Sequence, residues 1–271
     1  MRKSTGPRAG AGTIRMDVDQ VIVGAGAGAR RIAVRRRAGA SPGFVWLGGY
    51  RSDMAGTKAQ ALDAWCAGRG LACCRHDYSG HGQSGGEFRD GTISRWLEES
   101  LAVFDAFTSG PQVLVGSSMG AWIALRMAGE LARRGEAARL HAMLLIAPAP
   151  DFTEALMWPS LSEAQKRRIE RDGFLEAPSQ YSDEPNLYTR ALFEDGREHL
   201  VMSGPIATGC PVHILQGMAD PDVPWRHAMR LAELLAGEAV TVTLVKDGDH
   251  RLSRPADIDL MLRIAEGLAA R

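Results

Sequence analysis

The stretch VLVGSSMGAWIAL, residues 113–125, combines an apolar run, a turn of small residues and the start of a helical pattern. Its turn, residues 116–120, matches G-x-S-x-G, which places a serine on a sharp bend between a strand and a helix. Glycines flank the serine because a β-carbon there would collide with neighbouring chain. We therefore expect Ser118 to project from the end of a strand as a nucleophile. The neighbouring Ser117 should serve packing or hydrogen bonding.

The segments on both sides of this turn alternate between strand and helix patterns. The unbroken apolar run GFVWLGG at 43–49 is typical of a central parallel strand. The alternation predicts an α/β fold, with a mostly parallel central sheet and helices on both faces. Strands are expected within 43–49, 71–80, 111–120, 140–150, 210–217 and 239–248. Helices are expected within 56–70, 92–110, 119–135, 224–237 and 255–271.

The length of 271 residues, with 45% hydrophobic residues, suits one large domain. Residues 17–150 and 210–271 are predicted to form its core, and residues 1–16 a flexible N-terminal extension, with Met16 as an alternative start. Residues 151–209 break the alternation and are predicted to form a short helical lid, because long insertions between core strands often cover a site. The predicted lid contains scattered apolar side chains, namely Phe152, Leu156, Met157, Trp158, Phe174 and Tyr181. These side chains suggest that the pocket binds an acyl chain.

The glycine-rich stretch VIVGAGAGAR, residues 21–30, has the spacing of a dinucleotide-binding turn at Gly24, Gly26 and Gly28. Such a turn must lead into a helix, and an acidic residue about 20 positions later must hold the ribose. The following residues alternate as a strand does, and no acidic residue lies between Asp19 and Asp53. We therefore expect the loop of an N-terminal β-hairpin. A nucleotide-dependent oxidoreductase is the less favoured alternative.

A serine hydroxyl becomes a useful nucleophile when a base takes its proton and a carboxylate orients that base. His250 is the candidate base, because it follows the last predicted strand. Asp220 and Asp222 both follow the strand at 210–217. We favour Asp220 as the orienting acid, since it comes first after the strand, and expect Asp222 to cap the next helix. Of the other histidines, His76 and His81 are candidates to line the site, and the remaining four are expected to be structural.

A tetrahedral intermediate also needs two hydrogen-bond donors for its oxyanion. One should be the backbone amide of Met119, which directly follows the nucleophile at a helix N-terminus. The second should come from the loop after an earlier strand. The sequence WLGGYRSDM is that loop, and the amide of Tyr50 is the candidate.

Charge and composition limit the classes of partner and compartment that we expect. The net charge is zero, which argues against a nucleic-acid partner, and no apolar run approaches the ~18 residues of a membrane span. The four cysteines lack paired metal-ligand spacing and the density of a disulfide scaffold. We therefore expect reduced thiols and a cytoplasmic location. The apolar side chains of the lid favour a small-molecule or acylated substrate, and the family resemblance given next implies no metal or organic cofactor.

Several blocks together resemble the α/β-hydrolases, and they are LGGYRSDMAGTKA, RHDYSGHGQSGGEF, LVGSSMGAW, LQGMADPDVPW and DHR. They are most similar to the serine hydrolases related to the abhydrolase-type mitochondrial palmitoyl-protein thioesterase, also described as an acyl-glucuronide esterase. The resemblance covers roughly residue 42 to the C-terminus. It implies hydrolysis of acyl thioesters or esters by Ser118, Asp220 and His250, without a cofactor. Gly48 departs from the histidine of many α/β-hydrolases at this position. A non-catalytic binding protein and an acyl-glucuronide hydrolase remain alternatives.

Overall fold

The computed structural model describes residues 18–178, 185–237 and 239–271. The expected N-terminal extension at 1–16 and Tyr181 lie outside the described residues. In the part that is described, one eight-stranded sheet forms the centre of the molecule, with strand order β1-β2-β4-β3-β5-β6-β9-β10. Its strands are β1 (Asp19–Val23), β2 (Arg30–Arg37), β3 (Ala40–Leu47), β4 (Leu71–His76), β5 (Gln112–Ser117), β6 (Leu140–Ile146), β9 (Val212–Gly217) and β10 (Val240–Val245).

The direction of these strands confirms the predicted mostly parallel sheet. β2 runs antiparallel to both β1 and β4, whereas every pairing from β4 through β3, β5, β6 and β9 to β10 is parallel. The carboxyl ends of the parallel strands therefore open onto one edge of the sheet. Ligand sites of open α/β sheets form at that edge.

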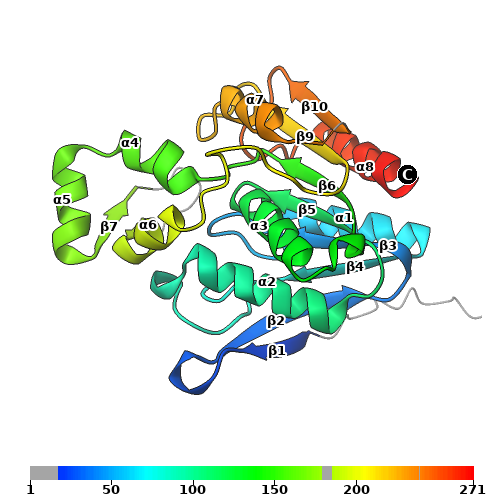
Figure 1. The fold of residues 1–271 in the computed structure, drawn as a ribbon, viewed down its shortest axis with the longest axis horizontal. Coiled ribbons are helices and arrows are strands. Elements are labelled where there is room, and N and C mark those ends of the chain that lie inside the picture. The colour runs from blue at the N-terminus through cyan, green and yellow to red at the C-terminus, as the bar shows by residue number, and fades with distance from the viewer. Residues whose placement is uncertain (1–17, 179–184, 238) are drawn as a thin grey trace, which may run out of the picture.

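Helices cover both faces of the sheet, as the sequence predicts (Figure 1). The strands supply side chains to both faces in turn, so that Phe44 and Trp46 of β3 enter one core and Val45 and Leu47 enter the other. Burying each large apolar side chain stabilises the fold by about 1.5–3 kcal/mol. The first core contains α1 (Thr57–Arg69) and α8 (Pro255–Ala269), and the second contains α2 (Ile93–Phe107), α3 (Met119–Arg133) and α7 (Trp225–Leu234).

The N-terminal glycine stretch forms the loop of a β-hairpin, which confirms that prediction. β1 and β2 pair antiparallel, and the loop places Gly24 and Gly26 at φ +80° and +56°. The chain then continues as a strand, so no helix N-terminus follows the glycines to hold a pyrophosphate. A buried ion pair, Arg30 Nε to Glu99 Oε1 at 2.6 Å, fastens the hairpin to α2.

The segment between β6 and β9 forms a separate lobe at one end of the sheet (Figure 1). It begins with a π-helical turn at Thr153–Met157, and its helices are α4 (Trp158–Ser160), α5 (Glu163–Asp172) and α6 (Arg190–Arg197). It also contains a two-stranded antiparallel sheet, β7 (Phe174–Ala177) with β8 (Asn186–Thr189), which the sequence pattern did not predict. A small apolar cluster of Leu161, Ile169, Leu175 and Phe193 holds the lobe together.

Candidate active site

The turn between β5 and α3 holds Ser118 in a strained conformation, at φ 54° and ψ −116°. The two flanking glycines are required by close packing. A β-carbon on Gly116 would lie 2.5 Å from the carbonyl oxygen of Gly120, and one on Gly120 would lie 2.1 Å from that of Leu47. Since non-glycine residues rarely adopt positive φ, the surrounding structure must hold this turn in place. Ser118 is thereby raised at the carboxyl edge of the sheet.

A continuous hydrogen-bond chain joins Ser118 to the two residues predicted as its partners. His250 Nε2 lies 3.1 Å from Ser118 Oγ, and His250 Nδ1 lies 2.8 Å from Asp220 Oδ2. Because a carboxylate oxygen only accepts, Nδ1 carries the proton and Nε2 faces the serine hydroxyl. The three residues come from the ends of β5, β9 and β10, and so from widely separated parts of the chain.

The Asp220 carboxylate is buried and well supplied with donors. Its Oδ1 accepts the backbone amides of Asp222 at 2.8 Å and Val223 at 2.9 Å, and its Oδ2 accepts Gln216 Nε2 at 3.1 Å. These three bonds fix the direction of the carboxylate, so its Oδ2 stays in place to accept from the imidazole of His250.

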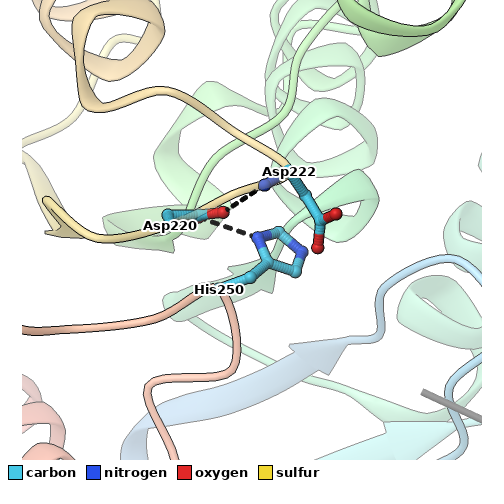
Figure 2. Close-up of side chains that lie close together, drawn as sticks. All are labelled: Asp220, Asp222 and His250. Atoms are coloured by element: carbon cyan, nitrogen blue, oxygen red, sulfur yellow. Dashed lines mark hydrogen bonds and ion pairs between the residues drawn. The ribbon is translucent and has the colours of Figure 1, made fainter. Parts of the chain in front are cut away.

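Asp222 also points toward His250 (Figure 2). The expectation that Asp222 caps the next helix is wrong, because α7 begins after Pro224 and receives no side-chain cap. Asp220, Asp222 and His250 place possible metal-ligand atoms within 4.8 Å of one another. A cation bound between them would compete with the Asp220–His250 hydrogen bond, so this geometry suits the chain that ends at Ser118 better than a metal centre.

The two candidate oxyanion donors belong to segments that meet at Ser118. The Met119 amide is the first N–H of α3, which helical geometry leaves without an intrahelical acceptor. Tyr50 lies in the loop after β3, which closely approaches the turn at Ser118. A β-carbon on Gly49 would lie 3.3 Å from the carbonyl oxygen of Ser117 and 3.4 Å from Ser118 Cβ.

A cavity of about 480 Å³ opens beside Ser118 and His250. Most of the residues that line it are polar, and its other members include Trp46, Tyr50, Arg51, Ser52, Asp53, Thr57, Lys58, Ser117, Asn186, Arg251 and Ser253. Of the apolar residues that suggested an acyl pocket, none of those that the structure describes lines this cavity. Phe152 packs against Tyr50 and Trp122, and Trp158 packs against Phe193. These aromatic side chains therefore fasten the lobe instead of lining this cavity.

Sequence reasoning missed Lys58. Its ammonium group donates to the carbonyl oxygen of Arg251 and, at 3.3 Å, to Ser253 Oγ, so it braces the loop that carries His250. Burial lowers the pKa of Lys58 to about 8. The signal was present in the G-T-K-A sequence at 56–59, but nothing local connects that lysine with a loop near the C-terminus.

The two histidines considered as lining residues, His76 and His81, are not among the described residues that line the cavity. His76 is fully buried, with Nε2 3.3 Å from Ser100 Oγ. His81 contacts the loop that carries Tyr50, because its Nε2 lies 3.1 Å from the Arg51 amide. The other four histidines each make a hydrogen bond elsewhere. His141 bonds to the carbonyl oxygen of Leu268, His199 to Ser94 Oγ, His213 to Thr243 Oγ1 and His227 to the carbonyl oxygen of Pro150.

Two solved structures resemble the whole described fold. A putative hydrolase from Agrobacterium vitis S4 is 54% identical, with a TM-score of 0.91 over 94% of this chain and 99% of that one. Mouse alpha/beta hydrolase domain-containing protein 10 is 32% identical, with a TM-score of 0.82 over 93% of this chain and 98% of that one. Both matches extend through the lobe and the sheet.

The expectation of a cytoplasmic location is wrong by comparison with curated relatives, which are named as mitochondrial proteins. That expectation was based on cysteines that were expected to be reduced. Reduced thiols do not distinguish the cytoplasm from other compartments that keep thiols reduced. Among the described residues, no helix is both long and apolar enough to cross a membrane.

The sequence comparisons agree with the fold. Residues 38–258 match the model of the alpha/beta hydrolase family. The human mitochondrial palmitoyl-protein thioesterase ABHD10 is 36% identical over 238 residues, which cover 88% of this chain and 76% of the relative. Together with the mostly parallel sheet and the serine turn at the carboxyl end of β5, these matches show that the chain belongs to the alpha/beta hydrolase family.

Proposed function

We propose that this protein is a serine hydrolase that cleaves carboxylic thioesters or esters through an acyl-enzyme. Ser118 is the nucleophile, His250 the general base and Asp220 the acid that orients it. The observation that carries the proposal is the hydrogen-bond chain from Ser118 Oγ to His250 at 3.1 Å and on to Asp220 at 2.8 Å. These distances lie in the range over which a base can take a proton from a hydroxyl group.

In the first half-reaction, Ser118 Oγ forms a bond to the substrate carbonyl carbon while its proton moves to His250 Nε2. Asp220 stabilises the imidazolium that results. The carbon–sulfur or carbon–oxygen bond then breaks, and His250 returns the proton to the leaving thiol or alcohol. In the second half-reaction, water takes the place of the serine hydroxyl, so the acid is released and Ser118 regains its proton.

The amides of Tyr50 and Met119 are proposed to hold the oxyanion of both tetrahedral intermediates. The Met119 amide lies at the N-terminus of α3, where the helix dipole favours negative charge. The close packing of Gly49 against Ser118 brings the second loop to the same place. A donor of this kind contributes on the order of 10²–10³ to kcat.

We further propose a fatty-acyl thioester as the first substrate class to test, because the human relative is named a palmitoyl-protein thioesterase. Residues 151–209 would form the lid, since Asn186 borders the cavity and the Tyr50 hydroxyl donates to the carbonyl oxygen of Leu187. Carboxylic esters and acyl glucuronides are the alternatives, because one hydrogen-bond chain serves all three and the pocket selects among them.

The test is labelling with a fluorophosphonate probe, read by intact mass. One adduct per chain is expected for the wild type and none for the Ser118→Ala variant. Competition with acyl thioesters and p-nitrophenyl esters of increasing chain length then ranks the substrates. Labelling that survives Ser118→Ala would defeat the assigned nucleophile, and a profile with no preference above acetyl would defeat the fatty-acyl substrate class.

A further inference from the structure

The loop that carries Tyr50 contains a strained residue directly after it. Arg51 adopts φ +57°, in the left-handed region that non-glycine residues rarely occupy. A residue held there costs about 1–3 kcal/mol and persists only where its surroundings fix it. The peptide that joins Tyr50 to Arg51 carries the Arg51 amide, so a contact that holds this amide also restrains the loop at Tyr50.

Such a contact is made by His81, which comes from the turn after β4, while the Arg51 guanidinium lies 5.0 Å from the centroid of the Phe88 ring. The Arg51 amide donates to His81 Nε2 at 3.1 Å, and His81 Nδ1 lies 3.1 Å from the carbonyl oxygen of Ser79. A carbonyl oxygen only accepts, so Nδ1 carries the proton and Nε2 is left as an acceptor. His81 thus links two loops through a single defined tautomer.

The ring of His81 is held firmly enough to serve as a fixed point. It is 5% exposed and packs edge-on against Tyr78, Phe88 and Trp96, with ring centroids 5.6, 5.0 and 5.4 Å away. Burial is the main cause that lowers the pKa of His81 to about 4, and the Arg51 charge adds to this while the Ser79 carbonyl and Asp53 oppose it. The imidazole is therefore neutral at neutral pH and able to accept the amide.

We propose that His81 is a positioning residue, which acts through the Arg51 amide to hold the Tyr50 amide toward the oxyanion. The proposal rests on the function proposed above. His81 is not among the described residues that line the cavity, so it has no direct route to the substrate. Gly49 lies so close to Ser118 that a small rotation of this loop would misdirect the donor.

Two amide variants form a matched pair. In His81→Gln, the longer side chain brings an amide oxygen near the position of Nε2, where it can accept the Arg51 amide. In His81→Asn, the shorter side chain reaches only the position of Nδ1, so the bond to Ser79 is kept and the bond to Arg51 is lost. We expect kcat to fall roughly 10–100-fold in the Asn variant and to stay within about threefold of wild type in the Gln variant.

Fluorophosphonate titration gives the concentration of active sites, and kcat and KM for p-nitrophenyl butyrate are expressed per titrated site. A merely structural role would reduce the number of sites without changing kcat per site. We also expect the Asn variant to lose affinity for phenylboronic acid, which forms a tetrahedral adduct on serine, while KM changes by less than about threefold. His81→Phe fills the ring volume without an acceptor and should match the Asn variant.

The proposal is overturned if the Asn and Gln variants have equal kcat per site, or if His81→Phe keeps the wild-type value. A wild-type enzyme that does not titrate would instead defeat the proposed function itself. The two failures are therefore distinguishable within one experiment.

Discussion

The turn at Ser118 and the loop at Tyr50 face each other across the site, and each contains a non-glycine residue at positive φ. They are held in different ways. Backbone bonds hold the serine turn, where the Ser118 amide donates to Ile146 at 2.9 Å and the Ser118 carbonyl accepts the amides of Ala121 at 3.0 Å and Ala149 at 3.2 Å. Flanking strands and glycines thus determine the geometry of the serine turn.

Side chains from distant segments hold the Tyr50 loop. His81 accepts the Arg51 amide at 3.1 Å, and Asp77 Oδ1 accepts the Met54 amide at 2.6 Å. Tyr50 itself donates through its hydroxyl to the lobe. Because each of these contacts depends on one replaceable side chain, the loop can be altered in steps. Changes at the serine turn should abolish the site or the fold outright.

The largest effect is expected from Ser118→Ala, which removes the proposed nucleophile. We expect kcat to fall by about 10⁴–10⁶ while the unfolding midpoint in urea stays at or above the wild-type value. Ser118→Gly should be equally inactive and more stable by up to about 1 kcal/mol, because glycine adopts φ 54° without strain. Substantial activity in either variant, measured after fluorophosphonate treatment, would show that another group attacks the substrate.

Gly120→Ala tests the close packing of the serine turn against β3. Its β-carbon would lie 2.1 Å from the carbonyl oxygen of Leu47, so one of the two elements must move. We expect the free energy of unfolding to fall by more than about 3 kcal/mol in urea denaturation. Gly129→Ala, in the same helix but with no atom within 4 Å of its β-carbon, is the control and should gain up to about 1 kcal/mol. A gain of similar size in both variants would mean that helix propensity, not packing, dominates.

These differences explain what the sequence could predict. The serine turn is encoded by adjacent residues, and the strand ends could be ordered from apolar runs, so Ser118, Asp220 and His250 could be proposed together from the sequence. The contacts of Lys58 and His81 depend on loops that only the fold brings together. β7 and β8 escaped prediction because they are four-residue strands without a long apolar run. The sequence did not predict that mostly polar residues line the cavity, because it does not show that the aromatic residues of the lobe pack against other aromatic side chains.

Acidic pH should lower the free energy of unfolding, because two histidines near the Tyr50 loop, His76 and His81, are buried in the neutral form. Burial lowers the pKa of His76 and His81 to about 4, from about 6.5 in an unfolded chain. As the pH falls from 6.5 toward 4, the unfolded chain binds these protons and the folded chain does not, so the folded state loses about 1.4 kcal/mol per pH unit for each ring. The titratable or charged groups near the two imidazole rings are Arg51 and Asp53 for His81, and His81 for His76.

Urea denaturation at pH 7 and pH 5 measures this loss. Burial raises the pKa of the Asp77, Glu99 and Asp151 carboxyls, which acts in the opposite direction, so the comparison must be made between variants. In His76→Phe, the stability lost between pH 7 and pH 5 should be about 2 kcal/mol smaller than in the wild type. An unchanged loss would mean that His76 takes up its proton while folded.

The smallest effect is expected from Tyr50→Phe, which keeps the backbone amide and the ring but removes the hydroxyl. Burial raises the pKa of Tyr50, so the hydroxyl stays protonated and donates to the carbonyl oxygen of Leu187 in β8. A lost hydrogen bond of this kind costs about 1 kcal/mol.

Loss of this hydrogen bond in Tyr50→Phe should weaken substrate binding, because Asn186 of the same strand borders the cavity. The backbone amide of residue 50, the proposed oxyanion donor, is unchanged. We expect KM to rise about threefold with kcat within about twofold. Steady-state kinetics on the preferred ester would check this. A selective fall in kcat with unchanged KM would mean that the lobe, through the Tyr50 hydroxyl, also directs the oxyanion donor, in addition to the proposed action of His81.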